Sequence, residues 1–225
     1  MQKVHALLFG AMLALTPALS HAQLPVSTGA QQSGGRDTRW QVAYGLTGGS
    51  LSAFSNAFVI VNPVWGNPSG ASWIGAAVTS SVEGGSGDGQ RRFTYVARTQ
   101  FSLNTGDQLT YRFQCTFDNY WLGLFVNGSQ VGTTACGGDN SFSFAPEFTV
   151  GPSSFAAGLN SVEFRWQGDG ITDGIVIRSS TATTFVPGSP GMPGVVPEPA
   201  TYALMATGLA GLVGIARRRK RSYRQ

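Results

Sequence analysis

The central part of this chain, Gln23–Val195, contains neither histidine nor lysine, because His5, His21, Lys3 and Lys220 all lie outside it. A domain without histidine cannot hold a Ser–His–Asp triad, a Cys–His pair or a histidine-ligated zinc. Among hydrolytic mechanisms, this leaves chemistry by paired carboxylates as the main enzymatic route.

Charge is also scarce in this central part, where eight arginines and ten acidic residues leave a formal charge of −2. The net charge of +4 for the whole chain therefore comes from basic residues at its two ends. Because the predicted domain is mildly acidic, we expect no nucleic-acid partner.

The N-terminus has the pattern of a secretory signal. Lys3 provides a positive charge, an apolar run follows at Ala6–Leu15, and small residues flank His21 at Ser20 and Ala22. We therefore predict a signal peptide over residues 1–22, cleaved after Ala22, and an exported domain. No cysteine follows the apolar run, so a lipid-anchored protein is not expected.

Three elements follow one another at the other end of the chain. The first is a short motif of Val196, Pro197, Glu198 and Pro199. Its prolines fix an extended backbone. Residues 201–216 carry no charge and as a helix would span about 24 Å, a little less than the hydrocarbon core of a membrane. Thinning of the membrane, or an Arg217 side chain that reaches toward the polar surface, could close this gap. The basic tail at 217–221 should stay on the cytoplasmic side.

This order resembles the PEP-CTERM sorting signal, which we assign to residues 196–221. The resemblance implies an exosortase as partner, a membrane protease or transpeptidase of Gram-negative bacteria. It also implies transient anchoring in the inner membrane and delivery to the cell surface or extracellular matrix. The family accompanies exopolysaccharide production and biofilm formation. An ordinary single-pass anchor is the alternative.

Between the two signals the sequence predicts one all-β domain. Residues 23–36 form a polar lead-in, 37–186 the domain, and 187–195 a Pro/Gly linker. Short alternating runs broken by Gly, Asn and Asp favour an antiparallel β-sandwich or jelly roll. The expected strands are Arg39–Tyr44, Ala57–Val61, Trp73–Thr79, Arg92–Phe101, Gln108–Cys115, Leu122–Val126, Phe142–Val150, Ser161–Trp166 and Gly174–Arg178.

The second half of this domain is similar to the galactose-binding-like jelly roll of many PEP-CTERM proteins. The similarity lies in "DN…VNG" from residue 118 and "AGLNSVEF" from residue 157, within Trp73–Ser179. Residues 39–68 fit that pattern poorly. The resemblance implies carbohydrate binding, and such jelly rolls commonly hold a structural calcium. We expect no other cofactor.

Cys115 and Cys136 are the two cysteines of the chain. An exported protein with an even cysteine count is expected to pair them. Closing this loop would stabilise the fold by about 3 kcal/mol in the chain-entropy model. Two buried free thiols are the alternative.

The candidate ligand-binding residues are Asp118, Asn119 and Tyr120, with Trp65 as a further aromatic platform. Carbohydrate sites combine flat rings, which stack on sugars, with short polar groups, which bind hydroxyls. The alternative is that Asp118 and Asn119 build a turn and that the tryptophans, including Trp65, pack in the core.

Other motifs predict structure more than function. Asp169 and Asp173 are interpreted as turn residues, not cation ligands, and residues 84–89 as a solvated hairpin tip. Residues 90–92 are expected to begin a strand, not to bind an anion. Only Glu147 and Glu163 are acids inside predicted strands, and nothing in the sequence brings them together. No catalytic residue is therefore predicted.

These observations favour a non-enzymatic protein of the cell surface or matrix, either carbohydrate-binding or a scaffold of exopolysaccharide. Extracellular polysaccharide is its expected ligand. Two alternatives stay open. One is a carboxylate-based glycan hydrolase or lyase, and the other is a structural surface protein that associates with itself.

Overall fold

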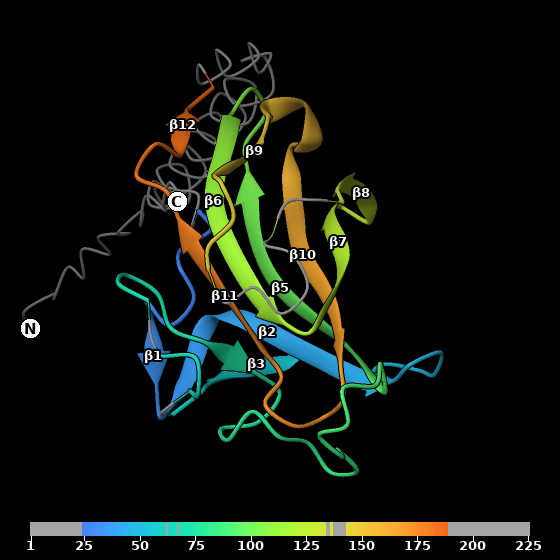
Figure 1. Ribbon diagram of the computed structural model, residues 1–225. Coiled ribbons are helices and arrows are strands. Elements are labelled where there is room, and N and C mark those ends of the chain that lie inside the picture. Colours follow the sequence, from blue (N-terminus) through green and yellow to red (C-terminus); the bar gives the residue numbers. More distant parts are fainter. Residues whose placement is uncertain (1–23, 62, 67, 134–135, 137–142, 189–225) are drawn as a thin grey trace, which may run out of the picture.

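The computed structural model describes residues 24–188 except 62, 67, 134–135 and 137–142 (Figure 1). The predicted signal peptide, the predicted helix at 201–216 and the basic tail lie outside the described residues. Within the described part, no helix has the length and apolar character needed to cross a membrane.

The described chain is all-β, as predicted, apart from the short 3-10 helix η1 at Pro152–Ser154. Every strand pair in it is antiparallel. The strands are β1 Gln32–Ser33, β2 Arg36–Leu46, β3 Ser55–Val59, β4 Ile74–Gly75, β5 Phe93–Leu103, β6 Gln108–Asp118, β7 Tyr120–Val126, β8 Ser129–Gly132, β9 Phe148–Val150, β10 Gly158–Gly168, β11 Gly174–Ser179 and β12 Thr184–Val186.

The strands form one hydrogen-bonded path that folds over on itself. Its order is β12-β6-β11-β4-β3-β2-β5-β10-β7-β8, with β1 on β2 and β9 on β6 (Figure 1). Phe113 of β6 and Phe164 of β10 meet edge to face, with ring centroids 5.1 Å apart. The β6–β11 layer thus packs on the β5–β10 layer, which confirms a sandwich, and β4 and β3 connect the two.

The period of two along β5 shows how the sequence builds this core. Phe93, Tyr95, Ala97 and Thr99 alternate along β5, and each is no more than 5% exposed. Tyr95 stacks on Trp166 of β10, with centroids 5.2 Å apart and ring planes within 14°. Alternate side chains of a strand point to opposite sides, so one face of β5 supplies the interior.

Two predicted strands are much shorter than expected. Of residues 73–79 only Ile74–Gly75 pair, because the small residues after Gly75 turn away toward Ser80, which has a left-handed backbone (φ 62°). Of the predicted strand at 142–150 only Phe148–Val150 pair, while residue 142 lies outside the described residues.

Three strands were missed. The clearest is β8, which follows a tight turn at Asn127 (φ 50°) and Gly128 (φ 81°) and pairs back on β7. Asn-Gly turns of this kind join adjacent antiparallel strands, so the turn signal also implied a returning strand. The short strands β1 and β12 were missed as well.

Cys115 of β6 is bonded to Cys136, with their Cα atoms 4.8 Å apart. Both are buried. The predicted pairing is confirmed and the alternative of two free thiols is wrong. The bridge ties the loop that follows β8 to the centre of β6.

Candidate ligand-binding pockets

The structure does not bring the four predicted ligand-binding residues into one pocket. Asp118 ends β6 and points inward, Asn119 donates from Nδ2 to Oδ1 of Asp173 at 3.1 Å, and Tyr120 begins β7 on the outside. Trp65 lies in a different pocket, described below. Asp118 is therefore buried, while Asn119 and Tyr120 are both half-buried and only Tyr120 of the three lines a pocket described below.

Asp118 and Asp173 are buried carboxyl groups, at 5% and 1% exposed. Burial, with a smaller contribution from the neighbouring Asp169, raises the pKa of Asp118 to about 6 and that of Asp173 to about 7. Asp173 accepts the Gly170 backbone N–H at 2.7 Å. Its described partners lie within the protein, as expected of a residue that organises a turn.

No group of three or more His, Cys, Asp or Glu in the described part of the chain is arranged to hold a metal ion. The structural calcium that the jelly-roll resemblance implied stays a prediction.

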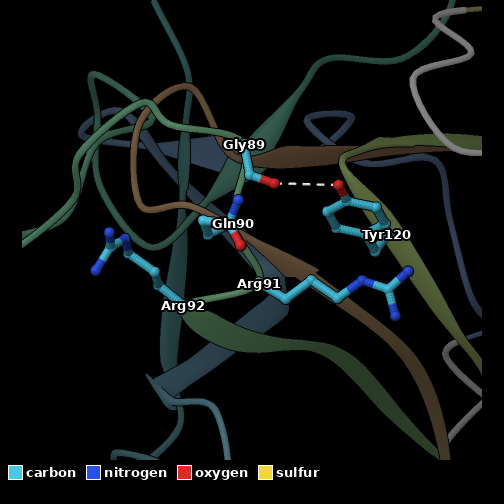
Figure 2. A pocket seen from close by; sticks show the side chains of 5 residues that line it. All are labelled: Gly89, Gln90, Arg91, Arg92 and Tyr120. Carbon is cyan, nitrogen blue, oxygen red and sulfur yellow. Dashed lines mark hydrogen bonds between the residues drawn. The ribbon is translucent and has the colours of Figure 1, made fainter.

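An open pocket of about 500 Å³ lies where β7 begins, beside the segment that leads into β5 (Figure 2). We call it the rim pocket, and its lining residues are Gly89, Gln90, Arg91, Arg92 and Tyr120. The Tyr120 hydroxyl donates to the Gly89 carbonyl oxygen at 3.0 Å. The guanidinium carbon of Arg91 lies 4.0 Å from the centre of the Tyr120 ring. Figure 2 shows Arg91 running toward Tyr120 while Arg92 points the other way.

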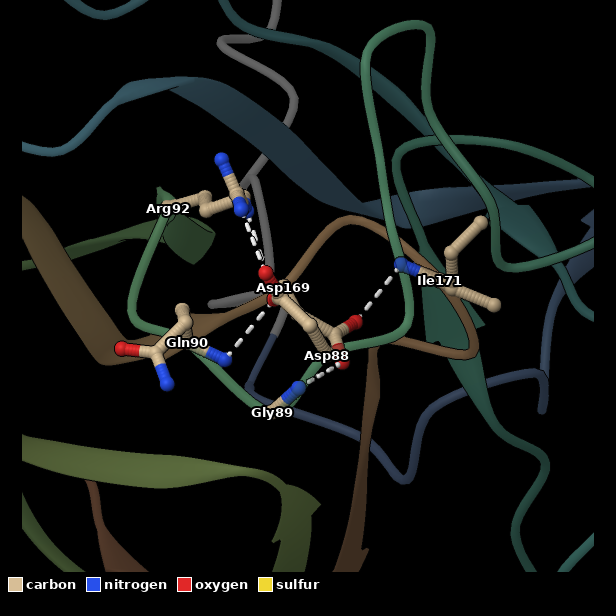
Figure 3. A network of polar contacts seen from close by, with 6 residues as sticks. All are labelled: Asp88, Gly89, Gln90, Arg92, Asp169 and Ile171. Atoms are coloured by element: carbon tan, nitrogen blue, oxygen red, sulfur yellow. Dashed lines mark hydrogen bonds and ion pairs between the residues drawn. The ribbon is translucent and has the colours of Figure 1, made fainter.

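Two aspartates, Asp88 and Asp169, accept hydrogen bonds from the backbone of this pocket (Figure 3). Asp169 accepts the N–H groups of Gly89 and Ile171, both at 2.9 Å. Asp88 accepts the Gln90 N–H at 3.1 Å and forms an ion pair with Arg92. That pair holds the pKa of Asp88 well below its ordinary value.

Residues 84–89 are exposed, as expected, except for the half-buried Gly85, but they are not a hairpin tip, because β4 and β5 on either side of them do not pair. Their backbone is docked on the 168–173 turn, where the Ser86 N–H donates to the Asp169 carbonyl oxygen at 3.2 Å. The close approach needs two glycines, because a Cβ on Gly85 would lie 2.3 Å from the Gly170 oxygen. The interpretation of Asp169 and Asp173 as turn residues is confirmed by their bonds to the N–H groups of Ile171 and Gly170.

Trp65 lies in a second pocket, of about 340 Å³, which we call the aromatic slot. Its lining residues are Trp65, Gly66, Pro68, Trp73, Thr116, Ser143, Phe144 and Val176. The Trp65 and Trp73 rings lie 4.2 Å apart, and the Trp65 side chain also hydrogen-bonds Asp118. The structure thus joins Trp65 to Asp118 but not to Tyr120.

The two acids expected inside strands each form an ion pair with an arginine. Glu163 of β10 binds the guanidinium of Arg165 at 2.6 Å. Glu147 precedes β9, so it lies outside the strand, and its carboxylate is 3.5 Å from Arg112. Each of the two glutamates therefore forms an ion pair with a different arginine.

Sequence comparison identifies the PEP-CTERM protein-sorting motif at residues 195–220. This motif marks the chain as an exported protein that an exosortase sorts toward the cell surface. No curated protein matches the chain.

Among solved structures, a GH31 α-xylosidase from Xanthomonas citri is 14% identical. The match covers 68% of this chain and 18% of the enzyme, with a TM-score of 0.34. A likeness this small carries no inference about fold or activity.

Proposed function

We propose that this exported protein binds an extracellular polysaccharide without cleaving it, through the rim pocket of its galactose-binding-like β-sandwich. The observation that carries the proposal is the Tyr120 ring, held at the surface by its bond to Gly89 and bordered by polar side chains. Aromatic rings beside hydrogen-bonding groups suit sugars, which have apolar faces and hydroxyl edges.

The pocket is built in advance of any ligand. Its volume of about 500 Å³ falls in the usual range of small-molecule sites. Asp88 and Asp169 bind the backbone N–H groups of Gln90 and Gly89, so the loop already has one arrangement. A site that needs little ordering loses less conformational entropy on binding.

The placement of the carboxyl groups supports binding without catalysis. A glycosidase needs two carboxyl groups on either side of the scissile bond. Asp118 and Asp173 are enclosed in the protein, and Glu147 and Glu163 are each engaged by an arginine.

The test is binding to a panel of polysaccharides by gel-affinity electrophoresis and glycan array, with the release of reducing ends measured in parallel. Tyr120→Ala should weaken binding by about 1–2 kcal/mol, the loss of one stacking ring, with little change in melting temperature. Tyr120→Phe keeps the ring and loses only the hydroxyl bond to Gly89, so it should weaken binding less than Tyr120→Ala does. Reducing-end release by the wild type would favour the hydrolase alternative instead.

The sorting step has its own test. Mass spectrometry of surface material should recover peptides up to residues 187–195 and none containing Arg217, because the exosortase removes the basic tail. A mature protein with an intact C-terminus would contradict this.

A further inference from the structure

We infer that the rim pocket recognises polysaccharides that carry carboxylate groups, and that Arg91 binds the carboxylate. This inference rests on the proposed function and adds the chemical class of its ligand. It also revises the expectation from sequence that residues 90–92 bind no anion.

Arg91 gives the rim pocket its uncompensated charge. The other arginine of the pocket, Arg92, is paired with Asp88. Among the described residues, no acidic side chain forms an ion pair with Arg91. Arg91 therefore presents a positive charge beside an aromatic ring, while the nearby carboxylate of Asp169 is engaged by the N–H groups of Gly89 and Ile171.

Arg91 also differs from the other arginines that stack on rings. Four more do so in the described chain, and each of them also donates from its guanidinium to a protein oxygen. These are Arg36 to Asn56, Arg98 to Gln41, Arg165 to Glu163 and Arg178 to Gln114. Arg91 has the ring contact without such an acceptor among the described residues. Its hydrogen-bonding capacity is directed to the pocket.

The stacked geometry leaves that capacity usable. A guanidinium group carries its five N–H donors in its own plane, so a ring on one face does not cover them. A carboxylate can then approach the edge and accept two parallel hydrogen bonds. The Tyr120 ring is itself fixed by Gly89, so the guanidinium has a rigid support. A uronic-acid residue offers both features, a ring and a carboxylate.

The experiment compares carboxylated polysaccharides (polygalacturonate, alginate and hyaluronate) with the same polymers after chemical reduction of their carboxyl groups. At least one acidic polymer should bind, and its reduced form should bind about tenfold or more weakly, since charge-assisted bonds are lost. Arg91→Gln should cause a similar loss. Arg91→Lys should recover part of it, because lysine keeps the charge but not the paired donors.

Arg36→Gln is the matched control, because Arg36 stacks on Phe58 at 3.7 Å but lines neither pocket. It should leave affinity unchanged, and an equal loss in both variants would overturn the inference as a general effect of charge. Equal binding of acidic and reduced polymers, weakened by Tyr120→Ala but not by Arg91→Gln, would overturn the inference and leave the proposed function standing. Binding to no polymer, acidic or neutral, would overturn both.

Discussion

Two aromatic contacts involve neighbouring residue pairs of β7 and β10, and one of them is buried while the other is at the surface. Trp166 pairs with Trp121, and its ring stacks on Tyr95 in the sealed interior. In the adjacent pair, Tyr120 lies opposite Gln167, and the Tyr120 ring contacts the Arg91 guanidinium at the rim pocket. Alternation along one strand sends Trp121 inward and Tyr120 outward.

The difference shows that aromatic side chains have two roles in this protein, one in the stability of the interior and one in the shape of a surface pocket. Inside, ring contacts remove apolar area from water and stabilise the fold. At the rim the ring remains partly exposed, so its contact with Arg91 shapes a surface. The carboxyl groups follow the same division, because the hydrogen bond from Arg92 lowers the pKa of the exposed Asp88, while burial raises that of Asp173.

The largest effect should come from the interior ring. Trp166→Ala should lower the free energy of unfolding by about 3–5 kcal/mol, because it leaves a cavity under Tyr95. Urea titration followed by circular dichroism measures this loss. A loss below 1 kcal/mol would show that the Tyr95–Trp166 stack does not carry the interior.

Reduction of the Cys115–Cys136 bridge should cost about 3 kcal/mol of unfolding free energy, since the loop it closes gains freedom in the unfolded chain. Urea titrations with and without dithiothreitol test this. The double variant Cys115→Ser with Cys136→Ser should show no response to the reductant. Two thiols that alkylate without reduction in the exported protein would contradict the bridge itself.

Stability should fall as the pH rises from about 4 to 8. Asp173 and Asp118 have raised pKa values of about 7 and about 6, so the folded protein keeps protons that the unfolded chain loses above pH 4. Their stabilising effect is complete below about pH 4, the range in which the unfolded chain is also protonated, and it declines as the pH rises through the two folded-state pKa values. Asp173→Asn should flatten the decline, and an unchanged slope in that variant would contradict the assignment.

The smallest effect should come from the rim ring. Tyr120→Ala should change the free energy of unfolding by less than about 1 kcal/mol, because surface substitutions remove little buried area. Measuring Tyr120→Ala and Trp166→Ala together tests directly whether the surface ring contributes less to stability than the buried ring. If Tyr120→Ala unfolds the protein and leaves residual binding intact, Tyr120 is a core residue and the pocket does not bind the ligand.

Local patterns predicted much of this molecule. The sorting motif, the all-β domain, the buried face of β5 and the cysteine pair follow from short stretches of sequence or from residue types. Local patterns failed where distant segments meet. The Gly85–Gly170 contact, for example, joins two turns that each look solvated when considered alone.

By itself, then, the sequence determined what depends on local order and composition. Its histidine-free centre excluded several catalytic mechanisms, and its C-terminal order of prolines, apolar residues and arginines specified sorting. Only the tertiary structure decided which of Asp118, Asn119 and Tyr120 reach the surface, and that Arg91 stacks on Tyr120. The reason is that burial and pairing depend on strands far apart in the chain, whose register no local pattern records.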